Sequence, residues 1–162
     1  MARTGGNWKL TYWKGGSYTM LKKELYMFPF VLIVLISLSG CATKLQSYQP
    51  KGPEELRVKE LFLKWESTWN SHDVPGHLSL WNENAQIMYG SNRQIAYKKE
   101  YTVILPERMR ANPSISVGVP DIKISENRAE VSVSLSLGGT QISATFYLIR
   151  ENNLWSIMSW KY

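Results

Sequence analysis

The C-terminal third of the chain alternates apolar and polar residues so regularly that the fold must contain an antiparallel sheet. From residue 129 to residue 137, an apolar side chain stands at every odd position and Glu or Ser at every even position. A strand with this period of two buries one face and leaves the other in water, as antiparallel strands do. Gly138-Gly139 then predicts a tight hairpin, and apolar residues return at every second position from Ile142 to Leu148.

The segments before this sheet predict helices. Pro53 suits the first position of a helix, and Glu54-Glu55 suits the positive end of its dipole. Apolar residues then recur every three or four positions to about residue 70, which predicts a helix with one broad apolar face. We expect a second, short helix after Asp73, and a third helix over residues 98–110 that Pro106 would bend or divide.

Shorter strands complete the order of elements. Residues 85–96 predict a hairpin around Gly90-Ser91-Asn92, whereas Asn82-Glu83-Asn84 predicts a turn. One strand, interrupted at Pro120-Asp121, is expected over residues 115–124, and the last strand over residues 154–162. The predicted fold class is therefore α+β, with three helices packed on an antiparallel sheet of about six strands.

Cys41 is the only cysteine, and the residues before it are ordered like a secretion signal. A basic pair, Lys22-Lys23, precedes an apolar run over residues 27–38, and Leu38-Ser39-Gly40-Cys41 ends it. This run resembles the lipobox of bacterial lipoproteins. The resemblance implies that the Cys41 thiol receives a diacylglycerol, that the chain is cut before Cys41, and that the new amino group is acylated. The alternative is an uncleaved membrane anchor, for which the apolar run is short, since a spanning helix needs about 20 apolar residues.

The signal divides the chain into four parts. Residues 1–19 fit no part of it, and Met20 would make an ordinary start, so we interpret residues 1–19 as an upstream extension that is not translated. The alternative is a longer signal peptide with an extended basic front. Residues 20–40 are then the signal peptide, residues 41–52 a tether rich in Lys, Ser, Gln and Pro, and residues 53–162 one folded domain.

The net charge of +6 overstates how basic the mature protein is. Residues 1–40 hold five of the 19 Lys and Arg residues and one of the 13 acidic residues, which leaves +2 for residues 41–162. The basic residues of this part are scattered singly or in pairs such as Lys98-Lys99. They form no electrostatic footprint for nucleic acid, and we expect none as a partner.

The order of elements and three motifs together resemble the nuclear transport factor 2-like superfamily, also called SnoaL-like. The motifs are a helix end with aromatic residues followed by Asn and Asp (65–73), the Tyr89-Gly90 hairpin, and two closing strands around a polar turn (147–157). The resemblance covers residues 53–162. It implies a cone-shaped barrel in which a strongly curved sheet wraps around the first helix.

Members of this superfamily include isomerases, cyclases, dehydratases and many non-catalytic modules, so the fold does not give the function. The isomerase-like members need a carboxylate inside the cone, and the apolar faces of the long strands carry none. His72 and Asp73 are the weak catalytic candidates, as a base and its orienting acid. The alternative is that Asp73 caps a helix and His72 is a solvated loop residue. No cluster has the spacing of metal ligands, and no cofactor fingerprint occurs, so we expect neither a metal nor a cofactor.

Aromatic residues from several elements would converge inside such a cone. They could form a pocket for an apolar or ring-shaped ligand, or they could simply fill the core. The pocket candidates are Trp65, Trp69, Tyr89, Tyr101 and Trp160.

We expect a lipid-anchored protein of the cell envelope with a non-catalytic domain that binds a ligand or takes part in assembly. In a Gram-negative cell, Ala42 after the lipidated Cys41 would by analogy favour the outer membrane, facing the periplasm. The outer sheet face is small and polar, which permits a homodimer. The main alternative is a small isomerase or cyclase acting on an apolar, ring-containing substrate, and the other is a scaffold whose cone is filled solid.

Overall fold

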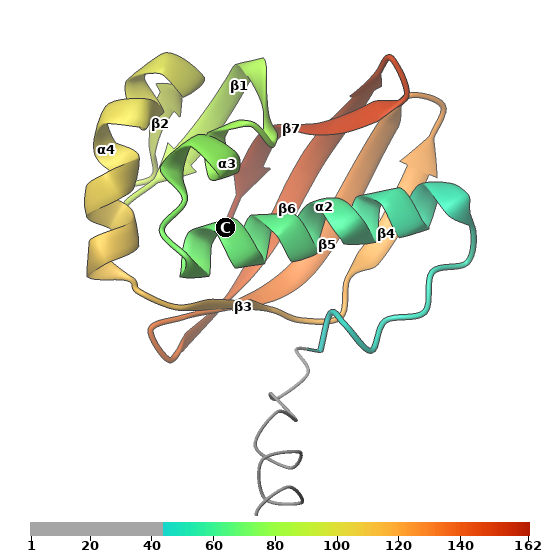
Figure 1. Cartoon of the computed structure of the whole chain (residues 1–162), viewed down its shortest axis with the longest axis horizontal. Coiled ribbons are helices and arrows are strands. Elements are labelled where there is room, and N and C mark those ends of the chain that lie inside the picture. Colours follow the sequence, from blue (N-terminus) through green and yellow to red (C-terminus); the bar gives the residue numbers. More distant parts are fainter. Residues whose placement is uncertain (1–43) are drawn as a thin grey trace, which may run out of the picture. The chain divides into compact units, whose positions relative to one another are not determined.

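A computed structural model describes residues 44–162 (Figure 1). The predictions about residues 1–43, including the signal peptide and Cys41, lie outside the described residues.

Three helices occupy the positions that the sequence predicts. They are α2 (Pro53–Asn70), α3 (Val74–Leu78) and α4 (Lys98–Ala111). Helix α2 lies across one face of the sheet (Figure 1). Helix α4 begins where the Tyr97 backbone N–H donates to the Glu100 carboxylate, at 3.0 Å. Pro106 lies inside α4 without dividing it, because the residues on both sides keep helical structure.

The sheet has seven strands, one more than the sequence predicts. They run in the order β2-β1-β7-β6-β5-β3, and β4 also pairs with β5. The strands are β1 (Trp81–Tyr89), β2 (Gln94–Tyr97), β3 (Ile115–Val117), β4 (Asp121–Ser125), β5 (Arg128–Leu137), β6 (Thr140–Glu151) and β7 (Leu154–Lys161). The expectation of a purely antiparallel sheet is wrong at one place, because β1 and β7 run parallel.

The predicted turn at residues 82–84 lies inside β1. The pairing of β1 with β7 shifts its register between Trp81 and Gln86, so an irregularity occupies this polar stretch. The Asn84 backbone N–H donates to the Asn82 side-chain oxygen at 3.1 Å. Asn residues are common both in turns and in irregular strands, so the Asn residues at positions 82 and 84 led to the prediction of a turn where the structure has an irregular strand.

Strands β3 and β4 are two pieces that pair in succession with the same strand, β5. Gly118 lies between them, where its N–H donates to the Ser134 carbonyl at 2.8 Å. A Cβ at Gly118 would lie 3.0 Å from that carbonyl oxygen, so only glycine allows this close approach without a shift.

The alternating pattern of β5 produces the core. Val131, Val133 and Leu135 are buried on the face that α2 covers, and the residues between them face outward. From α2, Phe62 meets Phe146 of β6 edge to face, with ring centroids 4.9 Å apart. Buried aromatic rings of this kind remove about 150–250 Å² each from water, so they dominate the stability of a domain of this size.

The segment before α2 packs on the domain, whereas the sequence predicts a tether over residues 41–52. Leu45 is fully buried in the core, and its backbone N–H donates to the Val117 carbonyl at 3.3 Å. Lys59 donates to the carbonyls of Gln46 and Tyr48, at 3.0 and 2.6 Å. From Leu45 onward the segment is therefore part of the folded unit, because its apolar side chain and its carbonyls find partners there.

Candidate functional site

The five predicted pocket residues belong to one continuous aromatic cluster. Trp65 lies 6.0 Å from Trp69 and 6.1 Å from Trp160, measured between ring centroids. Tyr101 lies 6.5 Å from Tyr89. Trp65, Trp69 and Tyr101 are each 1% exposed, so these three fill the interior. Trp160 and Tyr89 lie nearer the surface, at the end of the cluster beside α4.

His77 links the two halves of this cluster, and no role for it was predicted from the sequence. Its ring is fully buried, 5.3 Å from Trp65 and 6.4 Å from Trp81. The Thr68 hydroxyl lies 2.8 Å from the Lys64 carbonyl and 3.2 Å from His77 Nδ1, so His77 has one polar neighbour in this otherwise aromatic surrounding. Burial lowers the pKa of His77 to about 4, although the charge of Asp73 acts in the opposite direction. His77 is therefore neutral at neutral pH.

Glu66 is a buried acid that strand-based reasoning missed, because it lies on helix α2. Its side chain is 6% exposed, and it accepts a hydrogen bond from the Val117 backbone N–H at 3.2 Å. Burial raises the pKa of this carboxyl, and the hydrogen bond offsets part of that effect. Because Val117 also holds Leu45, Glu66 serves to attach β3 and the docked segment to α2.

His72 and Asp73 do not point at a common site. Asp73 is the N-cap of α3, where its carboxylate accepts from the Gly76 N–H at 2.9 Å. His72 is exposed, with a positive φ of 56°. The geometry matches the helix cap and solvated loop residue that were the alternative to a catalytic pair.

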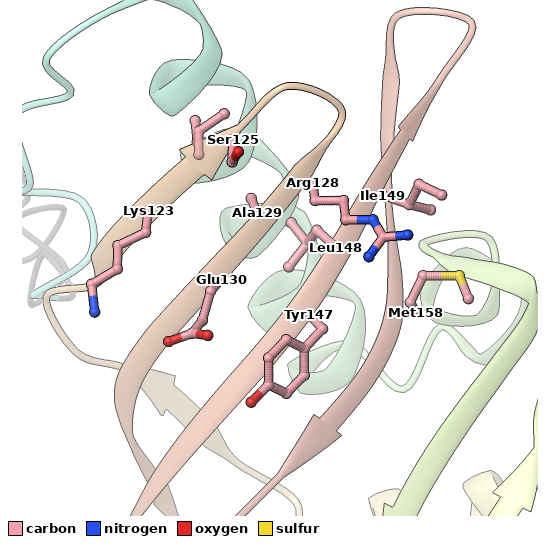
Figure 2. A pocket seen from close by; sticks show the side chains of 10 residues that line it. Lys123, Ser125, Arg128, Ala129, Glu130, Tyr147, Leu148, Ile149 and Met158 are labelled. Carbon is pink, nitrogen blue, oxygen red and sulfur yellow. The ribbon is translucent and has the colours of Figure 1, made fainter.

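On the part of the chain that the structure describes, we compare three surface hollows that are large enough to hold a small molecule. The first, of about 520 Å³, lies on the outer face of β4, β5, β6 and β7. Figure 2 shows Glu130, Tyr147 and Met158 standing on the side of the sheet away from α2. The Tyr147 ring is covered by Lys161, whose ammonium lies 5.1 Å from the ring centroid. This hollow is separate from the aromatic cluster.

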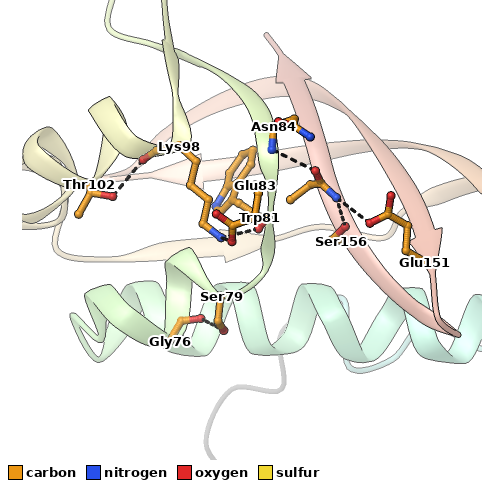
Figure 3. Close-up of polar contacts among 10 residues, drawn as sticks. Gly76, Ser79, Trp81, Glu83, Asn84, Lys98, Thr102, Glu151 and Ser156 are labelled. Atoms are coloured by element: carbon orange, nitrogen blue, oxygen red, sulfur yellow. Dashed lines mark hydrogen bonds and ion pairs between the residues drawn. The ribbon is translucent and has the colours of Figure 1, made fainter.

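The second hollow, of about 730 Å³, lies between α2 and the ends of β1 and β7. Its wall is closed by polar contacts (Figure 3). Asn82 donates to Glu151 at 3.2 Å and to Ser156 at 3.3 Å, while Lys98 binds the Trp81 carbonyl at 2.9 Å and Glu83. The charges of Lys98 and Glu83 are thus used within the protein, whereas Glu60 and Lys64, which also line this hollow, belong to none of the ion pairs among residues 44–162.

The third hollow, the mouth groove, lies where the aromatic cluster reaches the surface. Its volume is about 520 Å³, within the range of about 300–1,000 Å³ that small-molecule sites have. Two aromatic walls are held in place by hydrogen bonds, from Trp160 to the Met88 carbonyl at 2.7 Å and from Tyr162 to the Gly90 carbonyl at 2.8 Å. Its residues are Gly90, Ser91, Glu107, Arg108, Ala111, Asn112, Leu137, Thr140, Ile142, Trp160 and Tyr162.

Arg108 is the half-buried cation of the mouth groove. Its guanidinium carbon lies 5.8 Å from the centroid of the Tyr89 ring. Burial raises the pKa of the Tyr101 phenol to about 12, and the nearby positive charge of Arg108 opposes this rise. A signal for Arg108 exists in the sequence, since it follows Tyr101 by seven and Leu105 by three residues and so shares the apolar face of α4.

The sequence matches no known protein-family profile, and none of the curated proteins matches it. Solved structures are similar in fold. A nuclear transport factor 2-like protein from Cytophaga hutchinsonii has 11% identity and a TM-score of 0.60, over 67% of this chain and 96% of its own. One of unknown function from Shewanella baltica has 13% identity and a TM-score of 0.57, over 69% and 94%. A protein classed provisionally as a ketosteroid isomerase, from Shewanella frigidimarina, has 15% identity and a TM-score of 0.56, over 65% and 94%.

These likenesses show that the domain has the nuclear transport factor 2-like fold, as its curved seven-stranded sheet and helices indicate. At such low identity they show the fold alone. Within residues 44–162, no group of three or more His, Cys, Asp or Glu residues could hold a metal ion. No helix in the same part of the chain is both long and apolar enough to cross a membrane.

Proposed function

We propose that this chain is a cell-envelope lipoprotein whose domain binds a small, largely apolar ligand in the mouth groove without transforming it. The observation that carries the proposal is the groove itself. Two hydrogen-bonded aromatic walls, Trp160 and Tyr162, face the apolar side chains of Leu137 and Ile142 in a space of about 520 Å³. Walls fixed before binding lose little entropy when a ligand arrives, which favours affinity.

A binding role agrees with the positions of the titratable groups. A general acid or base must come within hydrogen-bond reach of the substrate, directly or through one water. His77 and Tyr101 are 0% and 1% exposed, and the carboxylate of Glu66 is hydrogen-bonded to the backbone. Glu107 lines the mouth groove but forms an ion pair with Arg110 at 2.7 Å. A small isomerase or cyclase would instead need one of these groups free at the groove.

Native mass spectrometry of the full chain, extracted gently from its membranes, tests the binding role. We expect a bound mass that is retained in wild type and lost in Tyr162→Ala, because Tyr162 forms one wall of the groove. Tyr147→Ala is the matched control, since Tyr147 is also half-buried but lies on the outer face of the sheet. A chain that carries no bound mass, or one whose bound mass survives Tyr162→Ala, would contradict a ligand site in the mouth groove.

A further inference from the structure

The mouth groove contains a charge that the protein leaves unmatched. Among residues 44–162, the ion pairs join other side chains, and no carboxylate oxygen lies within 4.0 Å of Arg108. The nearest acid in sequence, Glu107, is held by Arg110 at 2.7 Å. The Arg108 Nε is buried and has no hydrogen-bond partner among the described residues.

Such a cation is costly to keep in this position. Buried charges are normally paired, and partial burial of a charge is also unfavourable unless another charge or hydrogen bond replaces the lost hydration. The Tyr89 ring face compensates only in part, since a cation–π contact contributes about 0.5–1 kcal/mol at exposed sites. Arg108 therefore lines the groove with a guanidinium that no carboxylate of residues 44–162 neutralises, and because its Nε is buried, a ligand would meet its terminal N–H donors.

We propose that the ligand of the mouth groove carries a carboxylate, and that the Arg108 guanidinium binds it while the apolar part of the ligand packs on Trp160, Leu137 and Ile142. This inference rests on the proposed function, because it assigns the chemical class of the ligand for the same site. The guanidinium offers two parallel N–H donors, which match the two oxygens of a carboxylate.

The charges around the groove favour a single negative charge over a double one. Arg108 is the one cation among the residues that line it, and the carboxylate of Glu107 lines it as well. A phosphate monoester, with a charge near −2, would meet repulsion from Glu107 with only one cation to balance it. A carboxylate needs one cation, and the largely apolar remainder of the groove suits a ring or chain.

A pair of probes that differ only in charge tests the inference. The full chain, held in lipid nanodiscs, is titrated with 2-naphthoate and with 2-naphthamide, and binding to empty nanodiscs is subtracted. We expect 2-naphthoate to bind more tightly than 2-naphthamide. Arg108→Gln should weaken 2-naphthoate binding by roughly ten- to a hundredfold, because a hydrogen bond to a charged group contributes about 1.5–3 kcal/mol.

The controls separate this inference from the proposed function. Lys99→Gln removes the same charge from the exposed side of α4 and should leave both affinities unchanged. Retained 2-naphthamide binding by Arg108→Gln shows that the groove is intact. Arg108→Lys should bind 2-naphthoate with intermediate affinity, because Lys keeps the positive charge but lacks the two parallel N–H donors of Arg. Equal binding of the two probes, unaffected by Arg108→Gln but lost in Tyr162→Ala, overturns the carboxylate inference alone. Failure of both probes to bind overturns the proposed function with it.

Discussion

The two histidines of this protein lie five residues apart and meet opposite environments. His72 is an exposed loop residue, whereas His77 is fully buried among indole rings. The residue that a motif search finds first, His72 beside Asp73, is thus the one with the simpler structural role. The buried one is the histidine that should influence how the protein responds to pH.

We expect stability to fall as the pH drops from neutral, and His77→Gln to reduce this fall. The folded-state pKa of His77 is about 4, below the ordinary 6.5, so the unfolded chain binds more protons between these values. The stabilisation is complete above about pH 6.5 and is lost towards about pH 4, on the order of 3 kcal/mol at most. Urea unfolding of both proteins at about pH 7 and about pH 4.5 measures the difference.

Two features sharpen this pH experiment. The raised pKa of Glu66 acts with the opposite sign, stabilising the fold as the pH falls, but it is common to both proteins and cancels in the comparison. His72→Gln should leave the pH dependence as it is in wild type, because His72 is exposed. Equal pH slopes for wild type and His77→Gln would show that His77 is not held neutral by burial.

Two substitutions of Asp73 distinguish a helix-capping role of this residue from a catalytic role. Asp73→Ala should lower the free energy of unfolding by about 1 kcal/mol, because the Gly76 N–H loses its acceptor. Asp73→Asn should retain most of the stability, since Asn caps helices as well as Asp does. Denaturant unfolding of both variants measures this. A ligand affinity or an activity that Asp73→Asn abolishes at unchanged stability would favour the catalytic interpretation.

At the scale of elements, the spacing of apolar residues and the helix-capping residues correctly predicted the helices and strands that depend on local sequence. The helices α2 and α4 and the long strands β5 and β6 follow directly from apolar periodicity. The parallel pairing of β1 with β7 and the irregular start of β1 could not be predicted, because they depend on a strand more than 60 residues away in sequence. Arg108 was missed for a related reason, since its place beside Tyr89 requires β1 and α4 to meet.

Leu45 provides a test of how far the folded unit extends. Leu45→Ala should lower the free energy of unfolding of the full chain by about 2–5 kcal/mol, because it deletes a fully buried side chain from the core. Leu56→Ala is the matched control and should change it by less than about 0.5 kcal/mol, since Leu56 is 46% exposed on α2. Urea denaturation measures both. If the two variants unfold alike, the segment before α2 is a tether and not part of the core.

For the whole molecule, the sequence predicts a location in the cell envelope, and the structure describes a domain with the nuclear transport factor 2-like fold. The resemblance to a lipoprotein signal concerns residues 20–41, outside the described part of the chain. The groove and Arg108 belong to residues 44–162. Neither observation implies the other, so the proposal of an envelope protein that binds an apolar carboxylate needs separate tests of anchor and ligand. The outer sheet face, with its own hollow, leaves a homodimer as a further prediction.

We expect Cys41 to carry lipid. Bacteria that produce the full chain and are fed an alkyne-tagged fatty acid should label it, and Cys41→Ser should remove the label because no other thiol is present. Ser37→Ala, just outside the Leu38–Cys41 run, should stay labelled. Mass spectrometry should find that the mature chain begins at Cys41 with an acylated amino group, since two or three acyl chains are what stable anchoring requires. An unlabelled wild-type chain, or one that retains the residues before Cys41, would rule out the lipoprotein assignment while leaving the groove and its ligand to be judged separately.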